Sequence, residues 1–208
     1  MDIYMLAGSP QENVILPELH SGQSWIGVDR GALYLAEKGV HMKAAVGDFD
    51  SVSNSEMQVI RASAEEVITH PAEKDQTDLE LACTWAEPWA GKLYIYGALG
   101  GRMDHSLFAL QLLEAVQIPT VLLDRWNRME LLRPGEYTLE NTGSTYLSFL
   151  SVTDSVEGLV LSGTKYPLRN ASLRRGSSLC VSNEWQGDAA FVRFSSGLLL
   201  MIHSTDPA

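Results

Sequence analysis

The sequence has few of the features that mark specialised classes of protein. Its two cysteines, Cys83 and Cys180, are too few for a disulfide framework in 208 residues, and neither has a partner at metal-ligand spacing. No apolar run approaches the roughly 20 residues that span a bilayer, and the first residues lack the basic segment of a signal peptide. We therefore expect buried free thiols, a cytoplasmic location and no membrane partner.

Positive charge is also scarce. The chain carries 15 Lys and Arg residues against 26 Asp and Glu residues, which gives a formal net charge of −11. Because a protein that binds nucleic acid normally displays a basic stripe, we expect no nucleic-acid partner. Hydrophobic residues make up 45% of the chain, an ordinary value for a folded protein, and the length suffices for one large domain or two small ones.

The first 125 residues alternate short apolar runs with helical patterns. Ser53 with Glu56, and Thr77 with Glu80, fit the capping box that begins a helix. Strand–helix alternation predicts an open parallel α/β sheet with helices on both faces. The expected strands are residues 3–7, 25–28, 44–46, 66–69, 93–96 and 120–123.

Residues 126–208 have a different sequence pattern. Gly and Pro punctuate short apolar runs, and no convincing amphipathic helix is present. This pattern predicts a β-sandwich or barrel domain. We therefore expect two domains, residues 1–125 and 126–208, with the boundary within residues 124–134. The expected strands of the second domain are residues 130–132, 146–150, 158–161, 179–182, 190–194 and 198–203.

Aspartates follow several of the expected strands of the first domain. The carboxyl ends of the strands in an open α/β sheet share one edge, and ligands bind in the crevice outside it. The sequence therefore predicts that aspartates from four separate segments converge there. These residues are Asp29, Asp48, Asp50, Asp75, Asp78 and Asp104.

The Asp-x-Asp pair formed by Asp48 and Asp50 is the centre of this prediction. Like charges about 4 Å apart repel by about 1 kcal/mol in water and by more in a protein, so a bound cation would explain the convergence. Carboxylate oxygens are the ligands that Mg²⁺ takes, with waters and substrate phosphates completing its octahedron. Two carboxylates can reach one ion if the segment is a bent loop, and we expect Gly47 to permit that bend.

A glycine-rich turn, residues 97–101, runs from an expected strand into an expected helix. Backbone amides in such a turn, together with the helix N-terminus, favour a phosphate. Arg102 adds a permanent charge whose fork suits phosphate oxygens. The turn is not a P-loop, because no Gly-Lys-Ser/Thr follows its glycines.

Taken together, these motifs resemble the thiamine pyrophosphokinase family, bacterial type. The match follows the expected order over nearly the whole chain. The matching segments are residues 27–32, 47–51, 73–78, 100–105, 165–168 and 182–184.

The resemblance implies a diphosphotransferase that makes thiamine diphosphate from thiamine and ATP, with AMP leaving and Mg²⁺ as the cofactor. It implies that residues 1–125 bind ATP and metal, that residues 126–208 bind thiamine, and that the protein is a homodimer with thiamine near the subunit interface.

Site residues follow from motif position. The resemblance implies a catalytic set of Asp29, Asp48, Asp50, Asp78 and Arg102. It implies a metal set of Asp48, Asp50, Asp75 and Asp78. The implied substrate-binding residues are Lys74, Asp75, Gln76, Thr77, Asp104, His105, Ser182 and Asn183, the last two as thiamine contacts. Either Asp29 or Asp78 could take the proton of the thiamine hydroxyl.

One segment departs from the family pattern. Some members carry an aromatic residue near the C-terminus that stacks on thiamine, whereas residues 196–202 here contain none. Trp185 is one candidate for the ring contact. Two other functions fit the acidic motifs: an Asp-dependent phosphohydrolase or nucleotidyl transferase, and a thiamine- or nucleotide-binding sensor without catalysis. The complete acidic set, together with Arg102, argues against the sensor.

Overall fold

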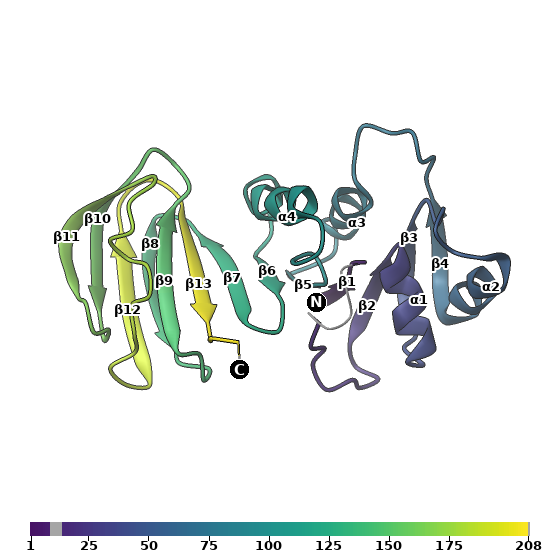
Figure 1. Cartoon of the computed structure of the whole chain (residues 1–208), viewed down its shortest axis with the longest axis horizontal. Helices are drawn as coiled ribbons and strands as arrows, with labels where there is room; N and C mark the ends of the chain where they lie inside the picture. Colours follow the sequence, from purple (N-terminus) through teal and green to yellow (C-terminus); the bar gives the residue numbers. More distant parts are fainter. Residues whose placement is uncertain (9–13, 208) are drawn as a thin grey trace. The chain divides into compact units, whose positions relative to one another are not determined.

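The structure is a computed structural model and describes residues 1–8 and 14–207. The chain divides into two compact units, Met1–Arg125 and Trp126–Ala208 (Figure 1). Among the described residues no helix is long and apolar enough to cross a membrane.

The first unit is built on parallel strands. The strands are β1 (Asp2–Leu6), β2 (Ser24–Val28), β3 (Met42–Gly47), β4 (Ala64–Thr69), β5 (Lys92–Tyr96) and β6 (Thr120–Leu123). Their order across the sheet is β4-β3-β2-β1-β5-β6, and each neighbouring pair is parallel. This confirms the predicted open parallel sheet. The strand order reverses between β1 and β5, which is where ligands bind in such sheets.

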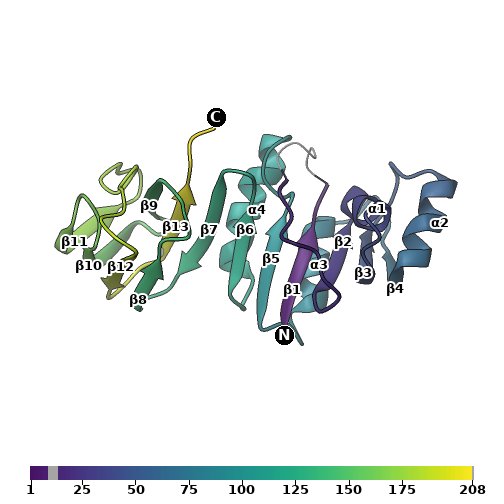
Figure 2. The ribbon, with the colours of Figure 1, turned by 90° about the horizontal axis from the view of Figure 1, so that it is seen from below.

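Helices cover both faces of this sheet, as predicted. The helices are α1 (Arg30–Glu37), α2 (Asn54–Ser63), α3 (Asp78–Ala86) and α4 (Met103–Ala115). Helix α1 contacts α2 and strands β1 to β3, whereas α3 packs on the other side of β2 and β3 and α4 packs on β6. In Figure 2, α3 and α4 lie behind the strands of the first unit.

Local sequence explains where two of these helices begin. Ser53 caps α2 with the full capping box predicted from the sequence: its hydroxyl accepts from the Glu56 N–H, and the Glu56 carboxylate accepts from the Ser53 N–H. Thr77 caps α3 by accepting from the Glu80 N–H (3.2 Å). Beneath α1 and α2 the core includes Trp25, which is fully buried.

The second unit consists of antiparallel sheets. Its strands are β7 (Asn127–Leu132), β8 (Gly135–Glu140), β9 (Tyr146–Ser151), β10 (Ser155–Ser162), β11 (Leu168–Arg174), β12 (Ala189–Phe194) and β13 (Leu199–Ser204). Strand β13 pairs with β7 and β9, and a second sheet has the order β11-β10-β12-β8. Side chains from both sheets, including Phe149 and Leu159, form one buried cluster. The predicted class, an α/β domain followed by a β-sandwich or barrel domain, is confirmed in its order, and the antiparallel sheets of the second unit share a core as in a sandwich.

The strand prediction for residues 179–182 is wrong, because this segment forms a turn. Cys180 is buried between exposed Leu179 and Val181, and this alternation imitates a strand. Ser182 has a φ of 54°, outside the region that regular strands adopt. Strands β8 and β11 were not predicted, because their residues are mostly polar or charged.

Candidate active site

A cleft of about 590 Å³ lies at the carboxyl edge of the parallel sheet, around the point where the strand order reverses. It is lined by the ends of β1, β2, β3 and β5 and by residues at the start of α3 and α4. Eight of the residues predicted from the sequence line this cleft: Asp29, Asp48, Lys74, Gln76, Thr77, Asp78, Arg102 and His105.

Asp29 stands between β2 and α1 in a conformation that residues other than glycine seldom adopt. Its φ is 48° and its ψ is −124°, a combination that costs roughly 1–3 kcal/mol. Two hydrogen bonds hold the backbone there: the Asp29 N–H donates to Val46 O (2.9 Å), and the Ala32 N–H donates to Asp29 O (2.9 Å). Backbone strain that is fixed in this way is concentrated at functional sites.

Asp48 and Asp50 lie in a bent loop, but the prediction that Gly47 supplies the bend is wrong. Gly47 is the last residue of β3, and Phe49 has the positive φ, at 55°. Glycine at position 47 instead allows a close approach, because a Cβ there would lie only 3.1 Å from Asp29 Cα and would press on the Asp29 backbone. Phe49 is 7% exposed and anchors the loop in the core, while the Asp50 N–H donates to Asp48 Oδ1 (3.1 Å).

Lys74 brings an ammonium group to two of the carboxylates. Its Nζ lies 2.9 Å from Asp78 Oδ1 and 3.8 Å from Asp48 Oδ2, and it donates a hydrogen bond to Pro71 O (3.2 Å). The side chains of Lys74, Asp48 and Asp78 are only 14%, 19% and 22% exposed. Solvent therefore screens these ion pairs less than it screens a surface pair.

Two buried carboxylate oxygens in the cleft have no hydrogen-bond donor among the described residues. They are Asp29 Oδ1 and Asp78 Oδ1. Asp78 Oδ1 is within ion-pair distance of Lys74 Nζ, yet the alignment is not that of a hydrogen bond, so its compensation there is electrostatic. A buried carboxylate oxygen without a donor is costly. Both oxygens are therefore positions at which a ligand or cation would be favourable.

The electrostatics of Asp29 confirm that acidic side chains gather at this edge. Burial raises the pKa of Asp29, and a hydrogen bond from the Arg30 backbone opposes this change. The negative charges of Asp48, Asp78 and Asp50 raise the pKa of Asp29 further. Aspartates from two other strand–helix connections thus lie close enough to Asp29 to act on its carboxylate, as their positions after the strands predict.

The glycine-rich turn between β5 and α4 needs its glycines. Gly97, Gly100 and Gly101 have φ values of 67°, 83° and 72°, a region that other residues rarely adopt. Gly97, Gly100 and Gly101 line the cleft, so their backbone reaches the same space as the carboxylates.

Arg102 and Asp104 form an exposed bidentate pair at the start of α4. Arg102 Nε donates to Asp104 Oδ1 (3.1 Å), and Arg102 Nη2 donates to Asp104 Oδ2 (2.5 Å). This pair lowers the pKa of Asp104 to about 2 and raises that of Arg102. Arg102 lines the cleft, but Asp104 does not. The structure therefore connects Asp104 to the site through Arg102.

Other predicted residues have structural partners or lie outside the cleft. Gln76 Nε2 donates to Glu80 Oε1 (3.3 Å), so this side chain, like that of Thr77, helps to begin α3. Asp50 and Asp75 are exposed and are not among the residues that line the cleft.

Ser182, in the second unit, is exposed on a turn beside β9. Its φ is 54°, and its N–H donates to Ser148 Oγ (2.9 Å). Ser148 is nearly buried. It was not predicted from the sequence, because the two residues are 34 positions apart and no local pattern connects them.

Asn183, in contrast, has an amide group that is fully used within the turn. The side chain is 2% exposed. Its Oδ1 accepts from the N–H groups of Tyr166 (3.0 Å) and Glu184 (3.0 Å), and its Nδ2 donates to Tyr166 O (2.9 Å) and Thr164 Oγ1 (3.3 Å). These contacts tie the segment containing Tyr166 to the turn containing Ser182.

Trp185, the candidate for a thiamine ring contact, packs against the core of the second unit. Its Nε1 donates to Ser144 Oγ (3.1 Å), and its ring lies 5.5 Å from that of buried His203. Burial lowers the pKa of His203, and the charge of Arg128 lowers it further.

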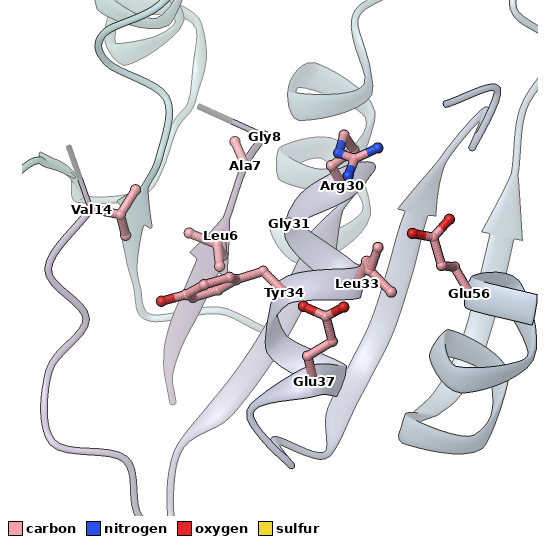
Figure 3. A pocket seen from close by; sticks show the side chains of 10 residues that line it. All are labelled: Leu6, Ala7, Gly8, Val14, Arg30, Gly31, Leu33, Tyr34, Glu37 and Glu56. Atoms are coloured by element: carbon pink, nitrogen blue, oxygen red, sulfur yellow. The ribbon is translucent and has the colours of Figure 1, made fainter. Parts of the chain in front are cut away.

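A smaller pocket of about 230 Å³ opens on the α1 face (Figure 3). It shares Ala7 and Gly8 with the cleft and is lined by Tyr34, Glu37 and Glu56. None of these three side chains was predicted as a site residue. Glu56 was predicted only as part of the capping box of α2.

An α/β sheet with converging carboxylates, a lysine and a glycine turn at its switch point defines an enzyme that transfers phosphate-containing groups. Residues 17–122 match the family model "Thiamin pyrophosphokinase, catalytic domain", and residues 136–199 match "Thiamin pyrophosphokinase, vitamin B1 binding domain". The chain therefore belongs to the thiamine pyrophosphokinase family.

Full-length relatives agree with this assignment. Over 213 aligned residues the chain is 38% identical to the thiamine pyrophosphokinase of Bacillus subtilis (strain 168), with 98% of this chain and 99% of the relative covered. A crystal structure of the thiamine pyrophosphokinase from Bacillus subtilis matches with a TM-score of 0.90 at 38% identity, covering 100% of both chains. The structure from Geobacillus thermodenitrificans matches with a TM-score of 0.89 at 37% identity, covering 100% of this chain and 99% of that one.

Proposed function

We propose that this enzyme transfers the diphosphoryl group of ATP to the hydroxyl group of thiamine and releases AMP. The observation that carries this proposal is the cleft at the switch point, where Asp29, Asp48 and Asp78 lie with Lys74 beside the glycine turn. Family membership supplies the acceptor. The chemistry requires in-line attack on the β-phosphorus, so the residues act mainly by positioning and by compensating charge.

Mg²⁺ is the cofactor that we propose for the cleft. The donor set fits, because carboxylate oxygens are its preferred ligands and a buried Asp78 oxygen lacks a hydrogen-bond donor. Within the described residues, no three acidic, histidine or cysteine side chains already surround one point. Mg²⁺ commonly takes one or two carboxylates and completes its shell with waters and substrate phosphates. Bound there, it would neutralise charge on the transferred phosphates.

Within this proposal the predicted metal residues differ in role. Asp48 and Asp78 hold the ion, since both line the cleft and share Lys74. Asp50 and Asp75 are exposed neighbours in the same loops and contribute negative charge around the ion.

We assign the phosphates of ATP to the space between Lys74 and the glycine turn. Lys74 and Arg102 supply cationic groups, and the backbone at Gly100 and Gly101 lines the same space. His105 lines the cleft on α4. Gln76, Thr77 and Asp104 support this site indirectly, since Gln76 and Thr77 form the start of α3 and Asp104 binds Arg102.

Asp29 is the residue that we propose accepts the proton of the thiamine hydroxyl. Asp78 is the alternative, but its Oδ1 is 2.9 Å from Lys74 Nζ. Asp29 lines the cleft, and its buried Oδ1 has no donor among the described residues, so a hydrogen bond from a hydroxyl group would compensate this oxygen. The raised pKa of Asp29 suits a proton acceptor.

Thiamine recognition is assigned to the second unit. The exposed hydroxyl of Ser182 is the polar contact that we propose, and Asn183 acts by holding the turn that carries it. Tyr166, Leu179 and Val181 are 56%, 53% and 46% exposed near this turn, an apolar surface that suits the thiamine rings or a second subunit. On this basis we propose a homodimer.

The cytoplasm is the proposed location. Cys83 and Cys180 are free and buried, which fits a reducing compartment, and ATP is available there.

The test of this function is AMP formation from ATP and Mg²⁺, with and without thiamine. We expect AMP and thiamine diphosphate in equal amounts, and AMP only when thiamine is present. Release of phosphate or pyrophosphate without thiamine would instead support the phosphohydrolase or nucleotidyl transferase.

A further inference from the structure

The position of Lys74 has a consequence for how metal enters the cleft. Its ammonium group lies 2.9 Å from Asp78 Oδ1 and 3.8 Å from Asp48 Oδ2, the two carboxylates to which we assign the metal. One positive charge therefore compensates both aspartates in the structure. An ion that binds them must displace this charge or accept its repulsion.

The surroundings of Lys74 hold it in this position. Its side chain is 14% exposed, and Nζ donates a hydrogen bond to Pro71 O (3.2 Å) in addition to its ion pairs with Asp78 and Asp48. Lys74 is also four residues before Asp78, which is the first residue of α3, so a single short segment carries both partners. The pair is therefore a local feature that forms without substrate.

We propose that Lys74 is an internal counter-ion that excludes free divalent metal from Asp48 and Asp78, so that metal enters only as its complex with the nucleotide. This inference rests on the proposed function. In this proposal Lys74 would pair with the phosphates of the nucleotide instead of Asp78, which would leave Asp48 and Asp78 free to hold the ion that accompanies the nucleotide. Substrate binding and metal binding are thereby coupled through one side chain.

The test is the affinity of the full chain for Mn²⁺ alone, measured without nucleotide by the electron paramagnetic resonance signal of free Mn²⁺. For Lys74→Met we expect binding at least about tenfold tighter than in the wild-type protein, because the competing charge is gone. Lys74→Gln keeps a polar group but removes the charge, and it should also bind Mn²⁺ more tightly than the wild type. The matched control is Lys43→Met, since Lys43 Nζ also lies 2.9 Å from a carboxylate, that of Glu65, away from the cleft. Its Mn²⁺ affinity should equal that of the wild type.

A double variant tests whether the additional Mn²⁺ affinity arises at Asp48. Asp48→Asn in the Lys74→Met background should abolish the gain in Mn²⁺ affinity. Mn²⁺ should also raise the melting temperature of Lys74→Met more than that of the wild type, because only the variant binds the free ion tightly. Unchanged or weaker Mn²⁺ binding in both Lys74 variants would overturn the proposal, as would a gain that survives Asp48→Asn.

Failure of this inference can be separated from failure of the proposed function. If the wild-type protein forms thiamine-dependent AMP while the Lys74 variants bind Mn²⁺ no more tightly, only the counter-ion role is refuted. If the wild type forms no thiamine-dependent AMP, the function itself is refuted, whatever the Mn²⁺ affinities are.

Discussion

The cleft of the first unit and the turn of the second unit both contain strained backbone, but they treat their polar groups in opposite ways. Asp29 and Ser182 have φ values of 48° and 54°. In the cleft, buried oxygens of Asp29 and Asp78 have no donor among the described residues. In the turn, both ends of the buried Asn183 amide are fully hydrogen-bonded.

This difference distinguishes a polar group that contacts a ligand from a polar group that holds a neighbouring residue in position. A buried oxygen without a donor lowers stability unless a ligand compensates it, so its persistence points to function. A saturated amide instead stabilises the backbone around it. Asp29 is therefore expected to act on substrate directly, whereas Asn183 is expected to act by positioning Ser182.

The largest effect should come from the carboxylates to which we assign the metal. We expect Asp48→Asn to lower kcat by about a hundredfold or more, because it would weaken the hold on the cation proposed to compensate charge on the transferred phosphates. Asp50→Asn should have a smaller effect, since Asp50 is exposed and does not line the cleft. Steady-state kinetics at saturating thiamine and ATP would compare the two. A larger loss for Asp50→Asn would move the metal toward Asp50.

The second prediction concerns stability in the second unit. Asn183→Ala removes a buried amide and the two hydrogen bonds that it makes to the part-buried backbone of Tyr166, and we expect it to lower the free energy of unfolding by about 2–4 kcal/mol. Asn170→Gly is a matched control, because Asn170 is exposed and has a φ of 50° that glycine adopts easily. Urea denaturation would measure both. Equal stability of Asn183→Ala and wild type would contradict a supporting role.

Features of the fold and the site that depend on residues close in the sequence could be predicted. The capping pair Ser53–Glu56 and the strand-end positions of Asp29 and Asp48 depend on residues that are close in the chain or on a rule of sheet topology. The predicted gathering of carboxylates agrees with the structure for Asp48, Asp50 and Asp78, whose negative charges raise the pKa of Asp29.

The rest depends on long-range packing. No local pattern shows that Gly47 is small because the Asp29 backbone lies against it, or that Ser148 holds Ser182. The apolar alternation around Cys180 predicts a strand, but the positive φ of Ser182 and the contacts of Asn183 make a turn. Strand β11 is polar and has Asn170 at positive φ, so it lacks a strand signature.

The third prediction has the smallest effect. Ser182→Ala removes one hydroxyl group from an exposed turn, and we expect the thiamine KM to rise about fivefold, as for the loss of one hydrogen bond, with little change in the ATP KM. Ser182→Gly removes the same hydroxyl but accepts the positive φ, so it separates recognition from backbone strain. A rise confined to the ATP KM would contradict thiamine recognition by Ser182.

Asp29→Asn tests most directly whether the cleft gives up stability for function. The pKa of Asp29 is raised in the folded protein above the value of 3.8 that its carboxyl has in the unfolded chain. The stability that this group contributes is therefore present below pH 3.8 and is lost as the pH rises through the pKa of the folded state. Asparagine removes the buried charge and tolerates positive φ. At pH 8 we expect a melting temperature about 2 °C or more above wild type and a kcat at least about a hundredfold lower.

The stability gain should shrink as the pH falls toward 3.8, where the wild-type carboxyl becomes protonated in both states. The measurement is the melting temperature and the kcat of Asp29→Asn and of the wild type, each at pH 8 and at pH 5. A variant that is inactive but more stable at pH 8 agrees with the account. A variant that is less stable than wild type at pH 8, or one that keeps normal turnover, contradicts it.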